Sequence, residues 1–175
     1  MGSSSSRSFE PLVSNHLTGL FNVALSLKTN DAALQQSSSA ALDQNVTDWI
    51  SVINGAMPGM GTMIGDAIRA SVQHEISIAF AIMHCHCVNN CICDNGELLR
   101  ASLAAMQATQ ENIVSGLHRI VGREEQWRHL LSRQLVGIVS YCTALSRSES
   151  GLDLQRQCYT DGLELSTALT SAIIG

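Results

Sequence analysis

The chain has 175 residues, of which 45% are hydrophobic but only 4% are aromatic. A chain of this length can form one domain with a sizeable core, and aliphatic side chains must fill that core, which favours helices over a β-sandwich. The formal net charge is −5, with a single lysine, Lys28, and no basic run that could neutralise phosphates. We therefore expect no nucleic-acid partner.

The first residues are polar, and residues 1–9 are predicted to be a disordered leader without the apolar core of a signal peptide. Further along, Asp66 and Arg69 interrupt the apolar stretches before they reach the roughly 20 residues that a membrane helix needs. Gly61 and Gly65 lie four residues apart, a spacing that lets two helices approach closely.

Six helical segments are indicated by apolar positions that recur every three or four residues. We expect them at residues 10–28, at 31–53, from 60 into a cysteine-rich stretch, from about 94 to a break at 122, at 123–146, and from 152 onward. Pro11 suits the start of the first helix, and Pro58 lies in a glycine-rich joint at residues 54–61. The sequence therefore predicts an all-α fold, a single helical domain over residues 10–175 built from antiparallel helical hairpins in a bundle.

Two of these segments carry apolar stripes that predict close helix packing. The fourth has a coiled-coil-like stripe with one polar member, Gln110, formed by Leu99, Leu103, Met106, Gln110, Ile113, Leu117 and Ile120. The fifth has a stripe formed by Trp127, Leu131, Leu135, Ile138, Cys142 and Leu145. We expect both stripes to face the core.

The stretch MHCHCVNNCICDNG at residues 83–96 holds four of the six cysteines. If residues 84–94 form a His/Cys-rich hairpin turn, four thiols share one face, those of Cys85, Cys87, Cys91 and Cys93. These thiols could hold Zn or Cu, with His84 and His86 as alternative ligands, or they could form cross-strand disulfides. If the third helix continues instead, these cysteines act as small hydrophobes. The three alternatives stay open.

The remaining chemistry is sparse. Cys142 and Cys158 could form an alternative disulfide between two helices. His74 and Glu75 are not followed by the second histidine of a zinc-protease helix, so the pair is interpreted as a polar pair at a helix surface. No phosphate-binding loop or activated nucleophile is recognisable, and we do not expect an enzyme.

Residues 45–83 carry a local resemblance to a known family. Val46, Thr47 and Asp48 are followed by Asn54, then by the Gly- and Met-rich residues 57–65, then by a helix that contains His74 and the apolar residues 79–80. In this order the segment resembles the Reb family, the structural proteins of bacterial refractile bodies. The family's Gln-rich segment is replaced here by the His/Cys stretch.

The resemblance implies a non-enzymatic subunit that needs no cofactor. It would polymerise, with itself alone or together with related subunits, into a ribbon that forms an inclusion in the bacterial cytoplasm, extends on acidification and disrupts the membrane of a target cell. Histidine titrates between about pH 5 and 8, and the chain has six. The residues predicted to respond to pH are His74, His84 and His86, with His118 and His129 as further choices.

Two other functions remain open from the sequence. One is a helical metal-binding module that uses the cysteines of residues 85–93. The other is a secreted helical effector or toxin, suggested by the scarcity of lysine and the apolar C-terminus.

Overall fold

The computed structural model describes residues 8–84 and 94–175. These residues form six α-helices and a closing π-helical turn, namely α1 (Glu10–Thr29), α2 (Ala32–Ala56), α3 (Met60–Met83), α4 (Asp94–Val121), α5 (Glu124–Ser146), α6 (Leu152–Leu169) and η1 (Thr170–Ile174). The described part of the chain contains no strand. The predicted all-α bundle of six helices is therefore confirmed.

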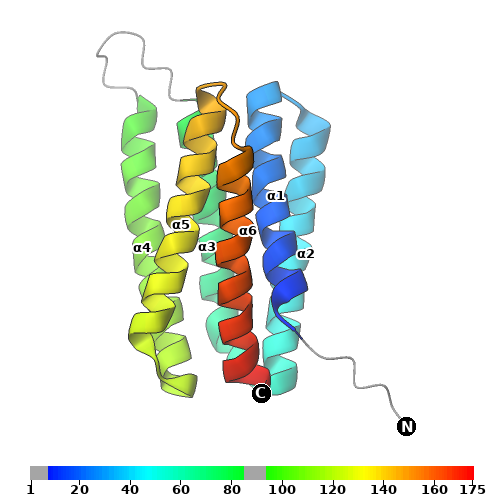
Figure 1. Ribbon diagram of the computed structural model, residues 1–175, viewed down its shortest axis with the longest axis vertical. Helices are drawn as coiled ribbons and strands as arrows, with labels where there is room; N and C mark the ends of the chain where they lie inside the picture. The colour runs from blue at the N-terminus through cyan, green and yellow to red at the C-terminus, as the bar shows by residue number, and fades with distance from the viewer. Residues whose placement is uncertain (1–7, 85–93) are drawn as a thin grey trace.

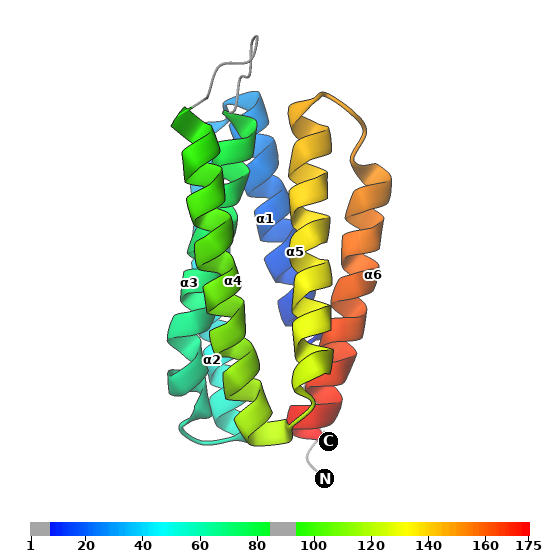
Figure 2. The same ribbon diagram turned by 90° about the vertical axis from the view of Figure 1, so that its left-hand side faces the viewer.

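The helices run alternately up and down the long axis of the bundle (Figures 1 and 2). Helices α1, α3 and α5 run in one direction and pack against one another. The other three run in the opposite direction, each packed against two of the inner helices: α2 against α1 and α3, α4 against α3 and α5, and α6 against α5 and α1. The centre of the bundle is thus the place where α1, α3 and α5 meet.

The ends of the first two helices follow from their local sequence. Pro11 occupies the first turn of α1, where its missing N–H costs no hydrogen bond. Asn30 ends α1 in the left-handed conformation, with φ of 55°, which asparagine tolerates better than most residues. Asp31 then caps α2, because its carboxylate accepts a hydrogen bond of 2.9 Å from the backbone N–H of Leu34.

The glycine-rich joint predicted at residues 54–61 is shorter than expected, because α2 continues to Ala56 and α3 begins at Met60. Met57 is extended, as a residue that precedes proline usually is. Gly61 lies so close to α2 that a Cβ atom on it would be 2.4 Å from the carbonyl oxygen of Ile50. The Gly61 and Gly65 spacing therefore serves tight packing of α3 on α2.

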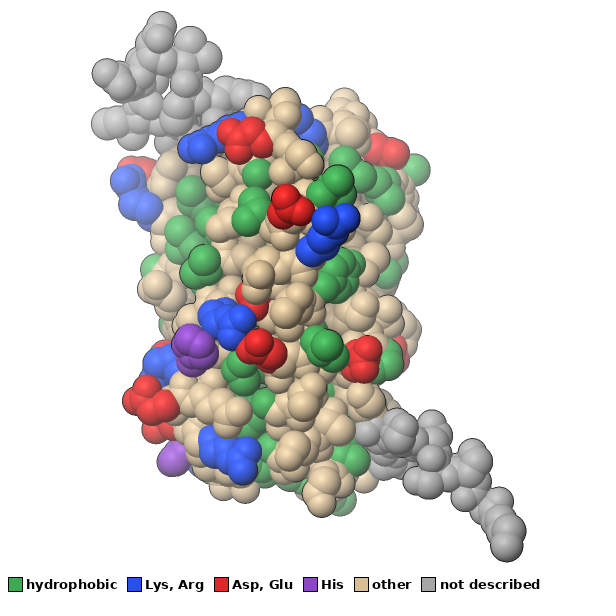
Figure 3. All heavy atoms as spheres, in the orientation of Figure 1, with side chains coloured by type: hydrophobic (Ala, Val, Ile, Leu, Met, Phe, Trp, Pro, Cys, Tyr) green, Lys and Arg blue, Asp and Glu red, His purple; other side chains and the backbone are tan. Residues whose placement is uncertain are grey.

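The core consists of two clusters of buried apolar side chains, one toward each end of the bundle. Both predicted stripes contribute to them: Met106, Ile113 and Leu117 of α4 are buried, as are Trp127, Leu135, Ile138 and Cys142 of α5. The other apolar members of the stripes are partly buried against the same clusters. The surface carries few charges, and on the face in Figure 3 acidic and basic side chains lie beside one another. Within the described residues, no helix combines the length and the apolar content required to cross a bilayer.

Candidate functional site

The predicted pH-responsive histidines lie at different places on the bundle. His74 is half-buried on α3, and His118 and His129 are exposed on α4 and α5. His84 follows the last residue of α3, where its ring stacks on Phe80 with 4.2 Å between the ring centroids. His86 lies outside the described residues. The structure therefore does not bring the predicted histidines together.

The predicted metal ligands Cys85, Cys87, Cys91 and Cys93 also lie outside the described residues. In the part of the chain that is described, no group of three or more His, Cys, Asp or Glu side chains is placed to hold a metal ion. The hypothesis of a Zn or Cu site in this stretch stays a prediction.

Cys142 on α5 and Cys158 on α6 belong to the same apolar cluster, and both are free thiols, so the alternative disulfide between them is not formed. Burial, and to a smaller extent the neighbouring Cys158, raise the pKa of the Cys142 thiol to about 12. Burial and the nearby Asp161 raise the pKa of Cys158 to about 11. Because the thiolate is the reactive form, both residues act as small core side chains at neutral pH.

The interpretation of His74 and Glu75 as a surface pair is wrong for Glu75. Glu75 is only 3% exposed and faces α1, where its Oε2 lies 3.0 Å from Nε2 of His16. Apart from this contact with His16, Oε2 accepts no hydrogen bond from the described residues. The contact is an ion pair that leaves part of the carboxylate's hydrogen-bonding capacity unused.

The pairing with Glu75 makes His16 hold its proton more tightly than an ordinary histidine does. Burial by itself would lower the pKa of His16, but the Glu75 carboxylate outweighs burial and raises the pKa above 6.5. The charged pair therefore forms fully below pH 6.5 and is lost as the pH rises through the raised pKa of His16.

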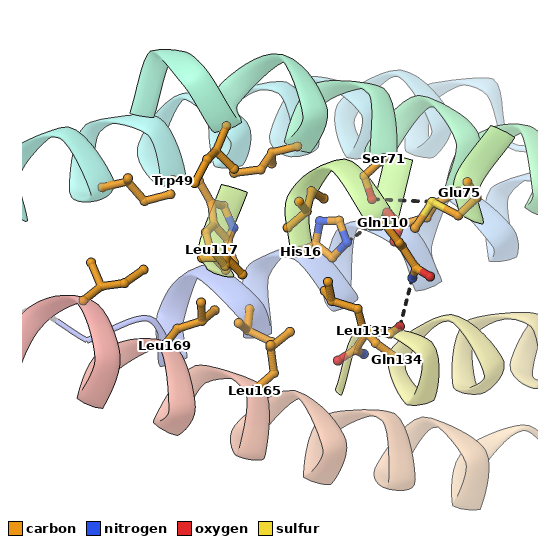
Figure 4. Close-up of a pocket in the computed structure, with 17 residues that line it drawn as sticks. His16, Trp49, Ser71, Glu75, Gln110, Leu117, Leu131, Gln134, Leu165 and Leu169 are labelled. Atoms are coloured by element: carbon orange, nitrogen blue, oxygen red, sulfur yellow. Dashed lines mark hydrogen bonds and ion pairs between the residues drawn. The ribbon is translucent and has the colours of Figure 1, made fainter. Parts of the chain in front are cut away.

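The pair lies at the wall of a partly open cavity of about 90 Å³ between the helices. The walls come from every helix and η1, and they consist of Val13, His16, Trp49, Ile53, Ile64, Ile68, Ser71, Glu75, Met106, Gln110, Ile113, Leu117, Leu131, Gln134, Leu165, Leu169 and Ile173. Figure 4 shows the polar side chains gathered toward one end of the cavity, whereas Trp49, Leu165 and Leu169 line the other end. The cavity is thus amphipathic along its length.

Two buried glutamines complete the polar end. Nε2 of Gln110, the polar member of the α4 stripe, donates a hydrogen bond of 2.9 Å to the backbone oxygen of Leu131 (Figure 4). Gln134 is 6% exposed, yet neither its Oε1 nor its Nε2 has a hydrogen-bond partner among the described residues. His16, Glu75 and Gln134 come from α1, α3 and α5, and Ser71 of α3 lies beside Glu75, so each inner helix supplies at least one polar side chain to the cavity.

Sequence reasoning considered five of the six histidines and missed His16, the one that is paired in the interior. A signal was present, since His16 lies three residues after Val13 and four before Leu20, both buried on the core face of α1. That position places a polar side chain inside the bundle, where it needs a partner. The partner could not be identified from sequence, because Glu75 belongs to another helix.

A second feature is the end of the bundle where α1, α3 and α5 finish and α4 and α6 begin (Figure 1), here called the His84 end. Seven large hydrophobic side chains are exposed in the described chain, and four of them lie within five residues of these helix termini: Leu25, Phe80, Leu98 and Leu152. Phe80 is 41% exposed and carries the stacked His84 ring. The His84 end thus joins exposed apolar side chains to a titratable group.

No protein-family model matches the chain, and neither a curated protein nor a solved structure does so. The resemblance to the Reb family therefore stays a prediction that rests on residues 45–83.

Proposed function

We propose that the protein is a non-enzymatic structural subunit that self-associates into a pH-responsive polymer of the refractile-body type. In this proposal the polymer forms an inclusion in the bacterial cytoplasm, alone or with related subunits, and acidification drives its action on a target membrane. The observation that carries the proposal is the His84 end, where four exposed apolar side chains lie close to the helix termini and one of them, Phe80, carries the stacked His84 ring.

The apolar part of this end favours contact between copies. Leu152 is 61% exposed, and Leu25 and Leu98 are each more than a third exposed, so their burial against a second copy would release apolar surface from water. Single exposed hydrophobics are ordinary on protein surfaces, but their gathering at one end of an elongated bundle suits end-to-end association.

The titratable part of this end supplies the pH response. His84 Nδ1 lies 3.0 Å from the backbone oxygen of Phe80, which holds the ring over the phenyl face. Charged side chains of both signs lie at the same end on the neighbouring helices and turns, including Lys28, Asp31, Glu97, Arg100, Arg147, Glu149 and Asp153. A protonated imidazole in an apolar contact between copies must lose its water, so acidification would weaken that contact.

The interior pair behaves differently on acidification. The charged contact between His16 and Glu75 is fully present below pH 6.5, because the pKa of His16 is raised. Lowering the pH from 7 toward 5 therefore does not remove the contribution of protonated His16 to folding. In the proposal, acid changes contacts between subunits while each bundle stays folded.

The test is the size of the purified full-length protein, measured by light scattering and negative-stain electron microscopy at pH 7.5 and pH 5. We expect ordered assemblies at pH 7.5 that change length or come apart at pH 5. Phe80→Glu should reduce assembly at pH 7.5, because it introduces a charge into the apolar end. His84→Gln should retain assembly at both pH values, because glutamine cannot gain a proton in this range.

Val136→Glu is the matched control, since Val136 is 65% exposed in the middle of α5, away from the His84 end. It should assemble as the wild type does. A wild-type chain that is monomeric at both pH values would refute the proposal, as would equal effects of the Phe80 and Val136 substitutions.

A further inference from the structure

The polar end of the cavity contains more hydrogen-bonding capacity than the chain itself uses. Gln134 offers an acceptor, Oε1, and a donor, Nε2, that are both unpaired among the described residues. Its side chain is only 6% exposed and lines the cavity. Because buried polar groups in proteins are nearly always paired, these atoms indicate a partner that the protein does not supply.

We infer that the cavity is a binding site for a small neutral amphipathic molecule whose hydroxyl group pairs with the amide of Gln134 while its alkyl chain lies along the apolar walls. An alcohol can accept a hydrogen bond from Nε2 of Gln134 or donate one to its Oε1, because its oxygen carries both a hydrogen and lone pairs. The alkyl chain then extends toward Leu117, Leu165 and Leu169, at the far end of the cavity (Figure 4).

The charge and size of the site set the class of ligand. His16 and Glu75 are the only ionisable residues among those that line the cavity, and they already compensate each other. A charged ligand would leave one buried charge without a partner, so the ligand is neutral. An apolar cavity of about 150 Å³ holds benzene. The volume here, about 90 Å³, is smaller, so we choose as the probe an alcohol smaller than benzene, 1-butanol.

The experiment measures binding of 1-butanol to the full-length protein by saturation-transfer difference NMR, with 1-chlorobutane as a probe of similar shape that has no hydroxyl group. This method observes the ligand, so it works whether or not the protein assembles, and a failure of the self-association proposal does not affect it. We expect saturable binding of 1-butanol, at least fivefold tighter than that of 1-chlorobutane.

Three variants locate the binding. Gln134→Leu should remove the preference for 1-butanol, because it removes the amide that pairs with the hydroxyl. Ile68→Phe should abolish binding of both probes, because the larger ring fills a wall position of the cavity. Val136→Phe, at a position on α5 that is 65% exposed, should bind as the wild type does.

Circular dichroism shows whether each variant is folded. If Gln134→Leu does not fold, two other results test the inference: the preference of the wild type for 1-butanol over 1-chlorobutane, and the loss of binding in Ile68→Phe. The inference is overturned if 1-butanol binding does not saturate, if the wild type binds both probes equally, or if folded Ile68→Phe binds 1-butanol unchanged.

Discussion

Replacing His16 by leucine removes one partner of the interior ion pair and leaves Glu75 alone in the core. Glu75 is 3% exposed, and no other described residue donates a hydrogen bond to its Oε2. Removing one partner of a buried pair typically costs about 3–5 kcal/mol. The His16 side chain is 17% exposed, which lets water reach the site, so we expect the lower end, about 3 kcal/mol. In a chain of this length that loss lowers Tm by roughly 6–12 °C.

The double variant His16→Leu/Glu75→Leu removes both charges and should restore the loss. Replacing a buried ion pair by apolar side chains of similar volume is often neutral or stabilising, so the double variant should lie within about 1 kcal/mol of the wild type near pH 6. The difference in free energy of unfolding between the wild type and the double variant also depends on pH. Because the pKa of His16 is raised in the fold, its contribution is present below pH 6.5 and declines above it. The wild type should therefore lose stability relative to the double variant between pH 6 and pH 9.

The assay is urea unfolding followed by circular dichroism at pH 6 and pH 9, at protein concentrations low enough that the midpoint does not depend on concentration. The other five histidines are common to both proteins, so their titration cancels in the comparison. A loss below about 0.5 kcal/mol for His16→Leu, within the range of a surface substitution, would refute the reasoning. So would a difference between wild type and double variant that is the same at both pH values.

Two further predictions concern packing. Gly61→Ala should destabilise the bundle by about 1–3 kcal/mol in urea unfolding, because the new Cβ would be 2.4 Å from the oxygen of Ile50, whereas Gly96→Ala, which meets nothing within 4 Å, should be neutral or stabilising. Equal effects would contradict the close approach of α3 to α2. Cys142 and Cys158 should resist iodoacetamide in the folded protein at pH 8 and react in urea, because their pKa values of about 12 and 11 keep them protonated. Peptide mass spectrometry would measure this, and equal labelling in both conditions would contradict it.

The helices could be predicted because their signals are local. The spacing of apolar residues within each segment identified six helices, and Pro11 marked the start of the first. The extension of α2 to Ala56 was missed, because asparagine and glycine near a helix end resemble a loop in sequence. In the fold, the turn is completed at Met57, next to Pro58.

The interior site could not be predicted, because its residues come from different helices. Glu75 follows a half-exposed histidine and was assigned to the surface with it, although one residue along a helix turns the side chain by about 100°. Gln110 was recognised as the polar member of an apolar stripe, whereas Gln134 stood outside the stripe chosen for α5 and was missed. What decides the burial of these residues is how the helices face one another.

Stability alone does not explain why the chain keeps a histidine and a glutamate in its centre, since two leucines are expected to do as well near pH 6. The polar side chains lie between the two apolar clusters, and each inner helix contributes at least one of them. A polar layer of this kind can fix the register of packed helices, because a shift of one turn would separate the partners inside the core. It can equally hold a ligand that pairs with Gln134. If Gln134→Leu is stable and folded but no longer prefers 1-butanol, the layer serves the ligand; if the double leucine variant is stable yet melts without cooperativity, the layer serves the register.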